Sequence, residues 1–298
     1  MHLSIEPSKD DVNLKKIIKL LCTTKIRQPL SFEQTKAWLK QFDKGPELTL
    51  ALLILRFLIY RTSDQLASSL KQALKYAVKN FIYQDQLLEN YDWREVINGT
   101  IGELDFYFGP IKHEYTTPGK SGEIITRLLK SCISTHSSGF DFYPDGMAEL
   151  KPKERYLLVD DGIYTGHQLN NFIGQNSLFN KFYSQTGVLV ALAHESGITY
   201  LQENQPNISV FYGEKITHKN CFKAISEEWI EDKVWPYNSI TPLEQYLEIA
   251  TNKARFKEDQ PLGYGNLGCL IAYDHGIPDD SLQLLWDKSE NWNPLIAR

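Results

Sequence analysis

Two stretches of the sequence are apolar at nearly every position, and they constrain the fold more than any other feature. Tyr156–Val159 is apolar up to Asp160, and Gly187–Ala193 is apolar throughout. A strand with one solvent-facing side alternates apolar and polar residues, so these continuous runs indicate strands covered on both faces. Helical patterns follow them at His167–Ile173 and Glu195–Glu203. This alternation predicts a parallel α/β sheet with covering helices, in which Tyr156–Val159 lies centrally.

The strand and helix alternation extends over residues 104–215. We predict further strands at Phe106–Lys112, Gly139–Tyr143 and Ile208–Tyr212, and a helix at Glu123–Cys132. The helices between the strands are the crossovers that parallel strands require. An antiparallel sheet in this region would contradict the prediction.

The first part of the chain has helical rather than strand patterns. Apolar residues recur at helical spacing in Val12–Leu21, and Leu48–Tyr60 is nearly all apolar. Ser31, with Gln34 three residues later, forms a capping-box pattern at a helix start. Another helix is expected at Gln65–Val78. No motif with known chemistry lies here, so we interpret the region as a packing domain or as a docking domain for a protein partner.

These patterns divide the chain into two expected domains. Residues 1–100 are expected to form a helical N-terminal domain, and residues 101–298 an α/β domain with an aromatic-rich C-terminal tail. The tail contains Trp286 and Trp292, and we expect it to dock onto its own domain.

Charge and cysteine usage limit the partners and the compartment. The formal net charge of -5 gives no overall basic field, so there is no direct sequence signal for nucleic acid or anionic lipid. The four cysteines form no CxxC pair, which fits a reducing cytoplasm. The first residues lack the basic and then apolar order of a signal peptide. Leu48–Tyr60 is too short to span a bilayer and contains Arg56, so we expect a cytoplasmic protein without a membrane segment.

The chemistry of the chain is concentrated in the turn that follows Tyr156–Val159. Two adjacent carboxylates, Asp160 and Asp161, end the apolar strand, and Thr165 and Gly166 precede a helix start. Ligands of parallel sheets bind at the carboxyl ends of strands, and a helix start offers unpaired N–H groups to a phosphate. The carboxylates can accept hydrogen bonds from a ribose diol or hold a hydrated Mg²⁺. The segment therefore predicts a site for a ribose that carries a 5-phosphate.

A simpler interpretation is a strand that ends in an Asp161–Gly162 turn, with polar residues that cap the next helix. It explains those two residues, but not the paired acids, the Thr-Gly pair and the helix start in one register. We favour the phosphate site.

A second candidate loop lies upstream, immediately before a helix. It contains Gly119, Lys120, Ser121 and Gly122, which suit a pyrophosphate at a helix start. It is not a Walker A loop, because residue 114 is glutamate where that motif requires glycine. A surface turn and cap is the alternative. If both loops follow strands of one parallel sheet, they should meet at one edge and form one cleft.

The turn after Val159 resembles the phosphoribosyl pyrophosphate (PRPP) motif of type I phosphoribosyltransferases. The resemblance implies that Asp160 and Asp161 contact the ribose hydroxyls. From the paired carboxylates we expect Mg²⁺ as a cofactor, together with a pyrophosphate ligand. The resemblance also implies a 5-phosphate loop made of five consecutive residues: Tyr164, Thr165, Gly166, His167 and Gln168. The sequence departs from the motif at Tyr164, where many members have threonine and purine-salvage members have aspartate.

Over nearly the whole chain, the sequence is similar to phosphoribosyltransferase-like proteins of bacterial conflict loci, including antiviral defence islands. The matching segments beside the two loops are Trp38–Phe42, Gly263–Gly265, Ile277–Leu282, Trp286 and Trp292–Leu295. Only this resemblance implies a role in defence.

Two functions remain open at this point. The first is an enzyme that acts at the anomeric carbon, with Asp160, Asp161, Lys120 and Mg²⁺ as its catalytic groups. The alternative is a non-catalytic subunit of a multi-component defence complex that senses a nucleotide or binds a partner. The residue Tyr164, in place of an acid, favours the alternative.

Two histidines lie outside the motifs. His194 follows the strand Gly187–Ala193, and we interpret it as a capping residue rather than a ligand contact. His275, beside Asp274, carries no assigned role.

Overall fold

A computed structural model describes residues 9–24, 26–82, 94, 106–111, 121–133, 154–175, 182–256 and 260–296. The chain divides into two compact units. One unit, which we call the sheet unit, is Ser63–Thr217. The other, which we call the terminal unit, combines Met1–Thr62 with His218–Arg298. Within the described ranges, no helix is long and apolar enough to cross a membrane.

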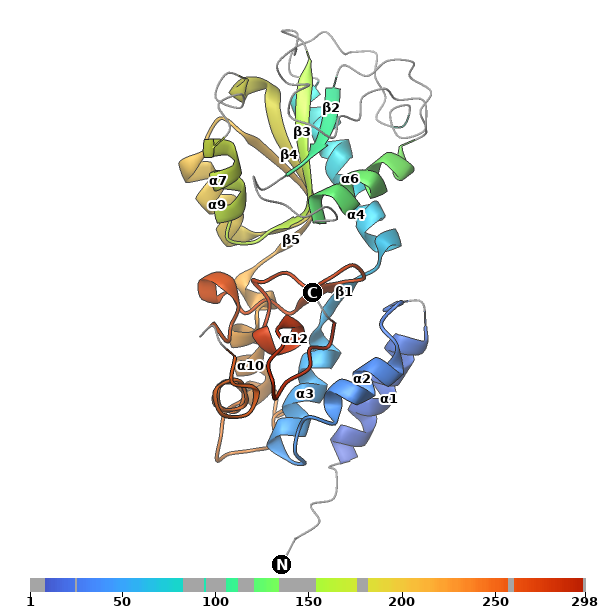
Figure 1. Cartoon of the computed structure of the whole chain (residues 1–298), viewed down its shortest axis with the longest axis vertical. Coiled ribbons are helices and arrows are strands. Elements are labelled where there is room, and N and C mark those ends of the chain that lie inside the picture. The colour runs from blue at the N-terminus through green and yellow to red at the C-terminus, as the bar shows by residue number, and fades with distance from the viewer. Residues whose placement is uncertain are drawn as a thin grey trace, which may run out of the picture. The chain divides into compact units, whose positions relative to one another are not determined.

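The described residues of the sheet unit form a four-stranded sheet in which all neighbouring strands run parallel (Figure 1). The strand order is β2 (Phe106–Pro110), β3 (Arg155–Ile163), β4 (Thr186–His194) and β5 (Ser209–Ile216). The prediction of a parallel sheet with Tyr156–Val159 away from its edges is therefore confirmed. The predicted strand Gly139–Tyr143 lies outside the described residues.

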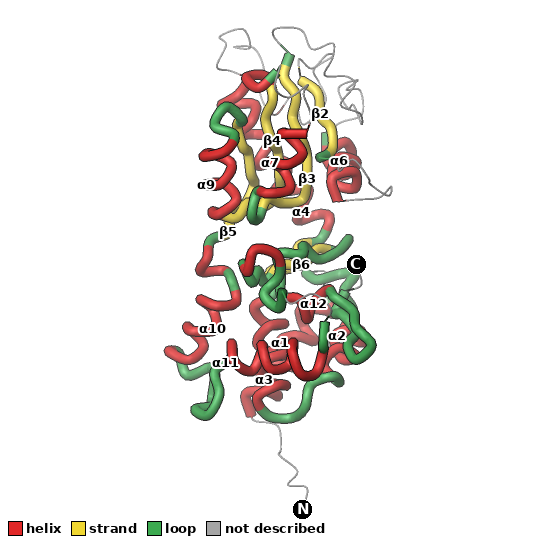
Figure 2. Tube along the Cα trace, turned by 60° about the vertical axis from the view of Figure 1, so that its left-hand side comes forward, coloured by secondary structure: helices red, strands yellow, loops and turns green. Residues whose placement is uncertain are grey.

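Helices lie on both faces of this sheet (Figure 2). They are α4 (Ser63–Ala77), α6 (Ser121–Cys132), α7 (His167–Gln175) and α9 (Glu195–Asn204). A π-helical turn, η1 (Val78–Ile82), follows α4, and a short 3-10 helix, η4 (Tyr183–Gln185), precedes β4. All nine positions of β4 are buried, as the continuous apolar run predicts. Leu158 of β3 and Val190 of β4 share a core cluster with Leu169, Ile173 and Leu201 of α7 and α9.

On the other face, α4 approaches the sheet very closely at Gly213 of β5. A Cβ atom at Gly213 would lie 2.1 Å from the carbonyl oxygen of Ser69 in α4. Only glycine allows two backbones to come this near. Beside this contact, the Ser69 hydroxyl donates a 2.6 Å hydrogen bond to Glu214.

The terminal unit is built from both ends of the chain. Its N-terminal elements are α1 (Lys9–Thr23), α2 (Phe32–Leu39), α3 (Pro46–Phe57) and β1 (Ile59–Arg61). Its C-terminal elements are η5 (His218–Asn220), α10 (Phe222–Glu231), α11 (Pro242–Glu248), η6 (Ile249–Ala254), η7 (Tyr264–Asn266), β6 (Ile271–Tyr273) and α12 (Gln283–Trp286). The capping box predicted at Ser31 and Gln34 is present at the start of α2.

Contacts between the two ends hold this unit together. β1 pairs in parallel with β6, with Ile59 opposite Ile271. The indole N–H groups of Trp38 and Trp292 both donate to the carbonyl oxygen of Leu284, at 3.2 and 2.9 Å. This division differs from the boundary at residue 100 expected from the sequence. The expected boundary was placed where the sequence changes from helical to strand patterns. Such local patterns contain no information on which distant segments pair with each other.

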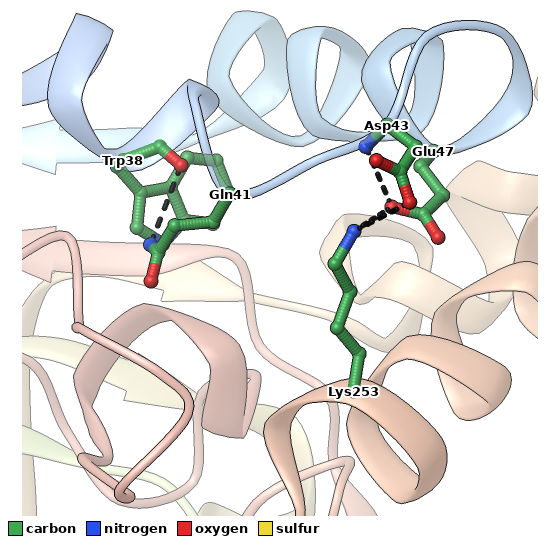
Figure 3. A network of polar contacts seen from close by, with 5 residues as sticks. All are labelled: Trp38, Gln41, Asp43, Glu47 and Lys253. Atoms are coloured by element: carbon green, nitrogen blue, oxygen red, sulfur yellow. Dashed lines mark hydrogen bonds and ion pairs between the residues drawn. The ribbon is translucent and has the colours of Figure 1, made fainter.

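A charged cluster near the start of α3 joins the same two ends (Figure 3). Lys253 of η6 donates to Glu47 at 2.7 Å and to Asp43 at 3.0 Å. Partial burial of Lys253 would lower its pKa, but the hydrogen bonds to the two carboxylates outweigh this and raise it. On the adjacent helix end, the Gln41 side chain donates to the carbonyl oxygen of Trp38 at 3.3 Å.

Arg27 is a buried cation that caps the carboxyl end of α3. Its guanidinium donates to the carbonyl oxygens of Leu55 at 2.5 Å and Leu58 at 2.9 Å. These are carbonyls that a helix end leaves without intrahelical partners. Burial lowers the pKa of Arg27 to about 10, so the group still carries its charge at neutral pH.

We expect Arg27→Met to lower the free energy of unfolding by about 2–3 kcal/mol, because buried carbonyl oxygens would lose charged donors. Lys36→Met is the control, since Lys36 pairs with Glu33 on the surface, where such pairs contribute about 0–1 kcal/mol. Urea denaturation measures both variants. Equal, small losses would show that Arg27 is not needed to close the helix end.

Candidate functional site

The turn between β3 and α7 consists of Tyr164, Thr165 and Gly166, and α7 begins at His167. Gly166 has φ +80°, a conformation that favours glycine. Its carbonyl oxygen accepts the first helical hydrogen bond, from Asn170 N–H at 3.0 Å. Backbone N–H groups at such a helix start are available to an anion.

Two glycines allow this turn to pack against α9. A Cβ atom at Gly166 would lie 3.0 Å from the carbonyl oxygen of Gly197 and 3.1 Å from the Tyr200 ring. A Cβ atom at Gly197 would lie 2.4 Å from the carbonyl oxygen of Tyr164. From the sequence, Gly166 was expected to be part of the 5-phosphate loop. The structure gives it a packing reason, which holds with or without a ligand.

The side chains of the predicted 5-phosphate loop have different environments. Tyr164 is buried and its ring lies over Gly162, where a Cβ atom would be 2.9 Å from the ring and its hydroxyl. Thr165 is half-buried and Gln168 is exposed. The His167 ring meets the Tyr200 ring edge-on, with centroids 4.5 Å apart. Thr165 and the helix start therefore offer donors to a ligand, whereas the Tyr164 ring folds back onto β3.

The two acids lie inside β3, not in a turn after it. Asp160 pairs with Val190 of β4, and Gly162 pairs with Leu192. The strand is longer than expected because pairing with β4 continues beyond the apolar run. Asp160 is 4% exposed, whereas Asp161 is half-buried.

The start of α6 reaches the same end of the sheet. The Ser121 hydroxyl donates to Asp160 Oδ1 at 2.9 Å. A Cβ atom at Gly122 would lie 2.7 Å from the carbonyl oxygen of Ile111 and 3.3 Å from that of Val159. The start of α6 therefore lies against the ends of β2 and β3, beside the acids. Gly119 and Lys120 lie outside the described residues, as does the loop of residues 144–153.

A model of one protein family matches residues 35–298, which include the whole β3–α7 turn and the start of α6. The chain belongs to the PRTase-CE family. The family is phosphoribosyltransferase-like, and the match supports the resemblance to phosphoribosyltransferases.

Other comparisons add little to the PRTase-CE assignment. No curated protein matches the sequence. Among solved structures, the AQ2163 protein from Aquifex aeolicus is similar at 13% identity over 65% of this chain and 87% of its own, with a TM-score of 0.33. A likeness of this size carries no argument about the site.

His194, at the end of β4, is confirmed as a capping residue in this PRTase-CE protein. Its Nδ1 atom accepts a 3.2 Å hydrogen bond from the Ser196 N–H at the start of α9. The His275 Nδ1 atom lies 3.3 Å from the Asp274 carboxylate, and its ring stacks on Tyr273.

A groove of about 630 Å³ lies along α9 and β5. It is lined by Glu195, Ser196, Ile198, Thr199, Tyr200, Gln202, Glu203, Tyr212 and Lys215. Tyr200 connects it to the start of α7 through His167 and through a 3.4 Å hydrogen bond from Asn170. Tyr200 was not predicted from the sequence, because its contact with His167 depends on how α7 packs on α9.

The two carboxylates of β3 are suitable ligands for Mg²⁺, which prefers carboxylate and water oxygens. Asp160 Oδ1 already accepts hydrogen bonds from Ser121 and from the Asp161 N–H, both at 2.9 Å. Asp160 is buried and Asp161 is half-buried, so Asp161 is the more accessible of the two to a hydrated cation.

We expect Gly166→Ala to destabilise the sheet unit by about 1–2 kcal/mol, because alanine is strained at positive φ. Gly174→Ala in α7 is the matched control, since a Cβ atom there meets nothing within 4 Å. Alanine in a helix should leave stability unchanged or raise it by up to about 1 kcal/mol. Thermal unfolding of both variants makes the comparison, and a loss of equal size at Gly174 would contradict the packing described for the turn.

Proposed function

We propose that this protein binds PRPP, or a related ribose 5-phosphate or nucleotide, at the β3–α7 turn, and that it transfers the phosphoribosyl group. One observation carries the proposal. The contact between Ser121 and Asp160 brings the start of α6 beside the acids of β3. A ligand with phosphates at both ends of a ribose needs two phosphate-binding segments on either side of those acids.

In the proposed complex, the α7 start and the Thr165 hydroxyl hold the 5-phosphate. Asp161 accepts hydrogen bonds from the ribose hydroxyls, and charge-assisted bonds of this kind are the strong ones. Gly119 and Lys120 are proposed to contact the pyrophosphate. These contacts fix the sugar ring at both ends and so orient its anomeric carbon.

In the proposed reaction, the bond between the anomeric carbon and the pyrophosphate oxygen breaks, and a bond to the acceptor nucleophile forms. The pyrophosphate leaves with both electrons of the broken bond. Lys120 stabilises the negative charge that develops on it. Mg²⁺, when bound, would neutralise part of the same charge. Membership of the PRTase-CE family supports this class of reaction.

The defence-locus role stays part of the proposal. It rests on the similarity to proteins of bacterial conflict loci and on no contact in the structure.

We expect Asp161→Asn to weaken binding of ribose 5-phosphate and of PRPP about 10- to 100-fold, because each charge-assisted hydrogen bond contributes about 1.5–3 kcal/mol. Glu227→Gln, an exposed acid on α10, removes the same charge elsewhere and should change neither affinity. Titration calorimetry measures binding, and pyrophosphate release with candidate bases measures turnover. Unchanged affinity of Asp161→Asn for both ligands would contradict the site.

Lys120→Ala tests the second loop separately. It should weaken PRPP binding much more than ribose 5-phosphate binding, because only PRPP carries the pyrophosphate that Lys120 would contact. The ratio of the two dissociation constants, measured by calorimetry in Mg²⁺, isolates that contact. Losses of equal size for both ligands would instead indicate a cradle for a single phosphate.

A further inference from the structure

The two adjacent acids of β3 differ in their surroundings. Asp160 is 4% exposed, and its Oδ1 atom accepts hydrogen bonds from the Ser121 hydroxyl and from the Asp161 N–H, both at 2.9 Å. A carboxylate oxygen has two lone-pair directions, so these donors occupy the acceptor sites of Oδ1. Asp161 is half-buried. The side chains of neighbouring strand residues point to opposite faces, which accounts for the difference.

The donor to Asp160 is the first residue of α6. Behind it, Gly122 lies against the carbonyl oxygens of Ile111 and Val159, with no room for a Cβ atom. The Thr126 hydroxyl donates to the Gly122 carbonyl oxygen at 2.7 Å within the first turn of α6. The hydrogen bond from Ser121 to Asp160 therefore fastens the start of α6 to β3 at a side chain, next to the backbone contact at Gly122.

We propose that Asp160 and Ser121 are positioning residues, and that Asp161 alone of the two acids contacts the ribose hydroxyls. Asp160 holds the start of α6 in place beside the acids of β3. Ser121 binds Asp160 and not the ligand. The inference rests on the proposed function and changes the roles that were expected from the sequence for Asp160 and Ser121.

Isosteric substitution distinguishes the two roles. An asparagine at residue 160 keeps a carbonyl oxygen that accepts from Ser121 and from the Asp161 N–H, but it removes the charge. If Asp160 acts as a positioning acceptor, Asp160→Asn should keep the affinities for ribose 5-phosphate and PRPP within about threefold of wild type. Asp161→Asn should weaken both at least about tenfold, since a ligand contact loses its charge.

Ser121→Ala removes only the hydroxyl, so the fold should survive. We expect it to weaken PRPP binding about tenfold or more and ribose 5-phosphate binding less than about threefold, because it loosens the start of α6, where the pyrophosphate is proposed to bind, and leaves the 5-phosphate cradle intact. Asp160→Ala should show the same split. Calorimetry of all four variants with both ligands in Mg²⁺ gives the comparison.

Hydrogen exchange of the ligand-free protein provides a second readout. Amides in the first turn of α6 should exchange faster in Ser121→Ala and Asp160→Ala, and at the wild-type rate in Asp160→Asn and Asp161→Asn.

Three outcomes would overturn the inference alone. They are an Asp160→Asn loss as large as that of Asp161→Asn for both ligands, a Ser121→Ala loss equal for both ligands, and unchanged exchange in Ser121→Ala. Wild-type protein that binds neither ligand would overturn the proposed function, and this inference with it.

Discussion

Burial of the two inner strands on both faces is the constraint on which the sheet unit depends. Every position of β4 and the first six of β3 are buried, so helices must cover the sheet on each side. Parallel pairing in turn places the ends of β2, β3 and β4 at one edge. Because each strand is followed by a helix, the polar residues after the strands gather at that edge. The proposed site therefore follows from the burial of apolar side chains.

Close approach between helices and strands is set by glycine. Gly122, Gly166, Gly197 and Gly213 each lie where a Cβ atom would meet a backbone oxygen at 3.0 Å or less. These contacts place α4, α6 and α9 against the sheet and against the β3–α7 turn. A larger side chain at any of them would move a helix, and at Gly122 or Gly166 it would also move a segment of the proposed site. The geometry of the site is thus coupled to the packing of its scaffold.

Local patterns predicted most of the sheet unit. The apolar runs at Tyr156–Val159 and Gly187–Ala193 identified β3 and β4, because a strand that is buried on both faces is apolar at nearly every position. The end of β3 and the composition of the terminal unit were not predicted. Both depend on pairing with distant residues: Asp160 with Val190, and Ile59 with Ile271. The buried Arg27 was missed for the same reason, since its acceptors become adjacent only after α3 has packed.

The position where β3 ends decides how two adjacent acids are used. Had the strand ended at Val159, as the apolar run indicated, both carboxylates would lie on a turn with freedom to face one ligand. Instead pairing extends to Ile163, opposite Ala193, and the alternation of a strand separates the two side chains. One carboxylate is buried against the start of α6, and the other remains half-buried beside the turn. A sequence motif gives the order of residues, but the extent of strand pairing determines which of them a ligand can reach.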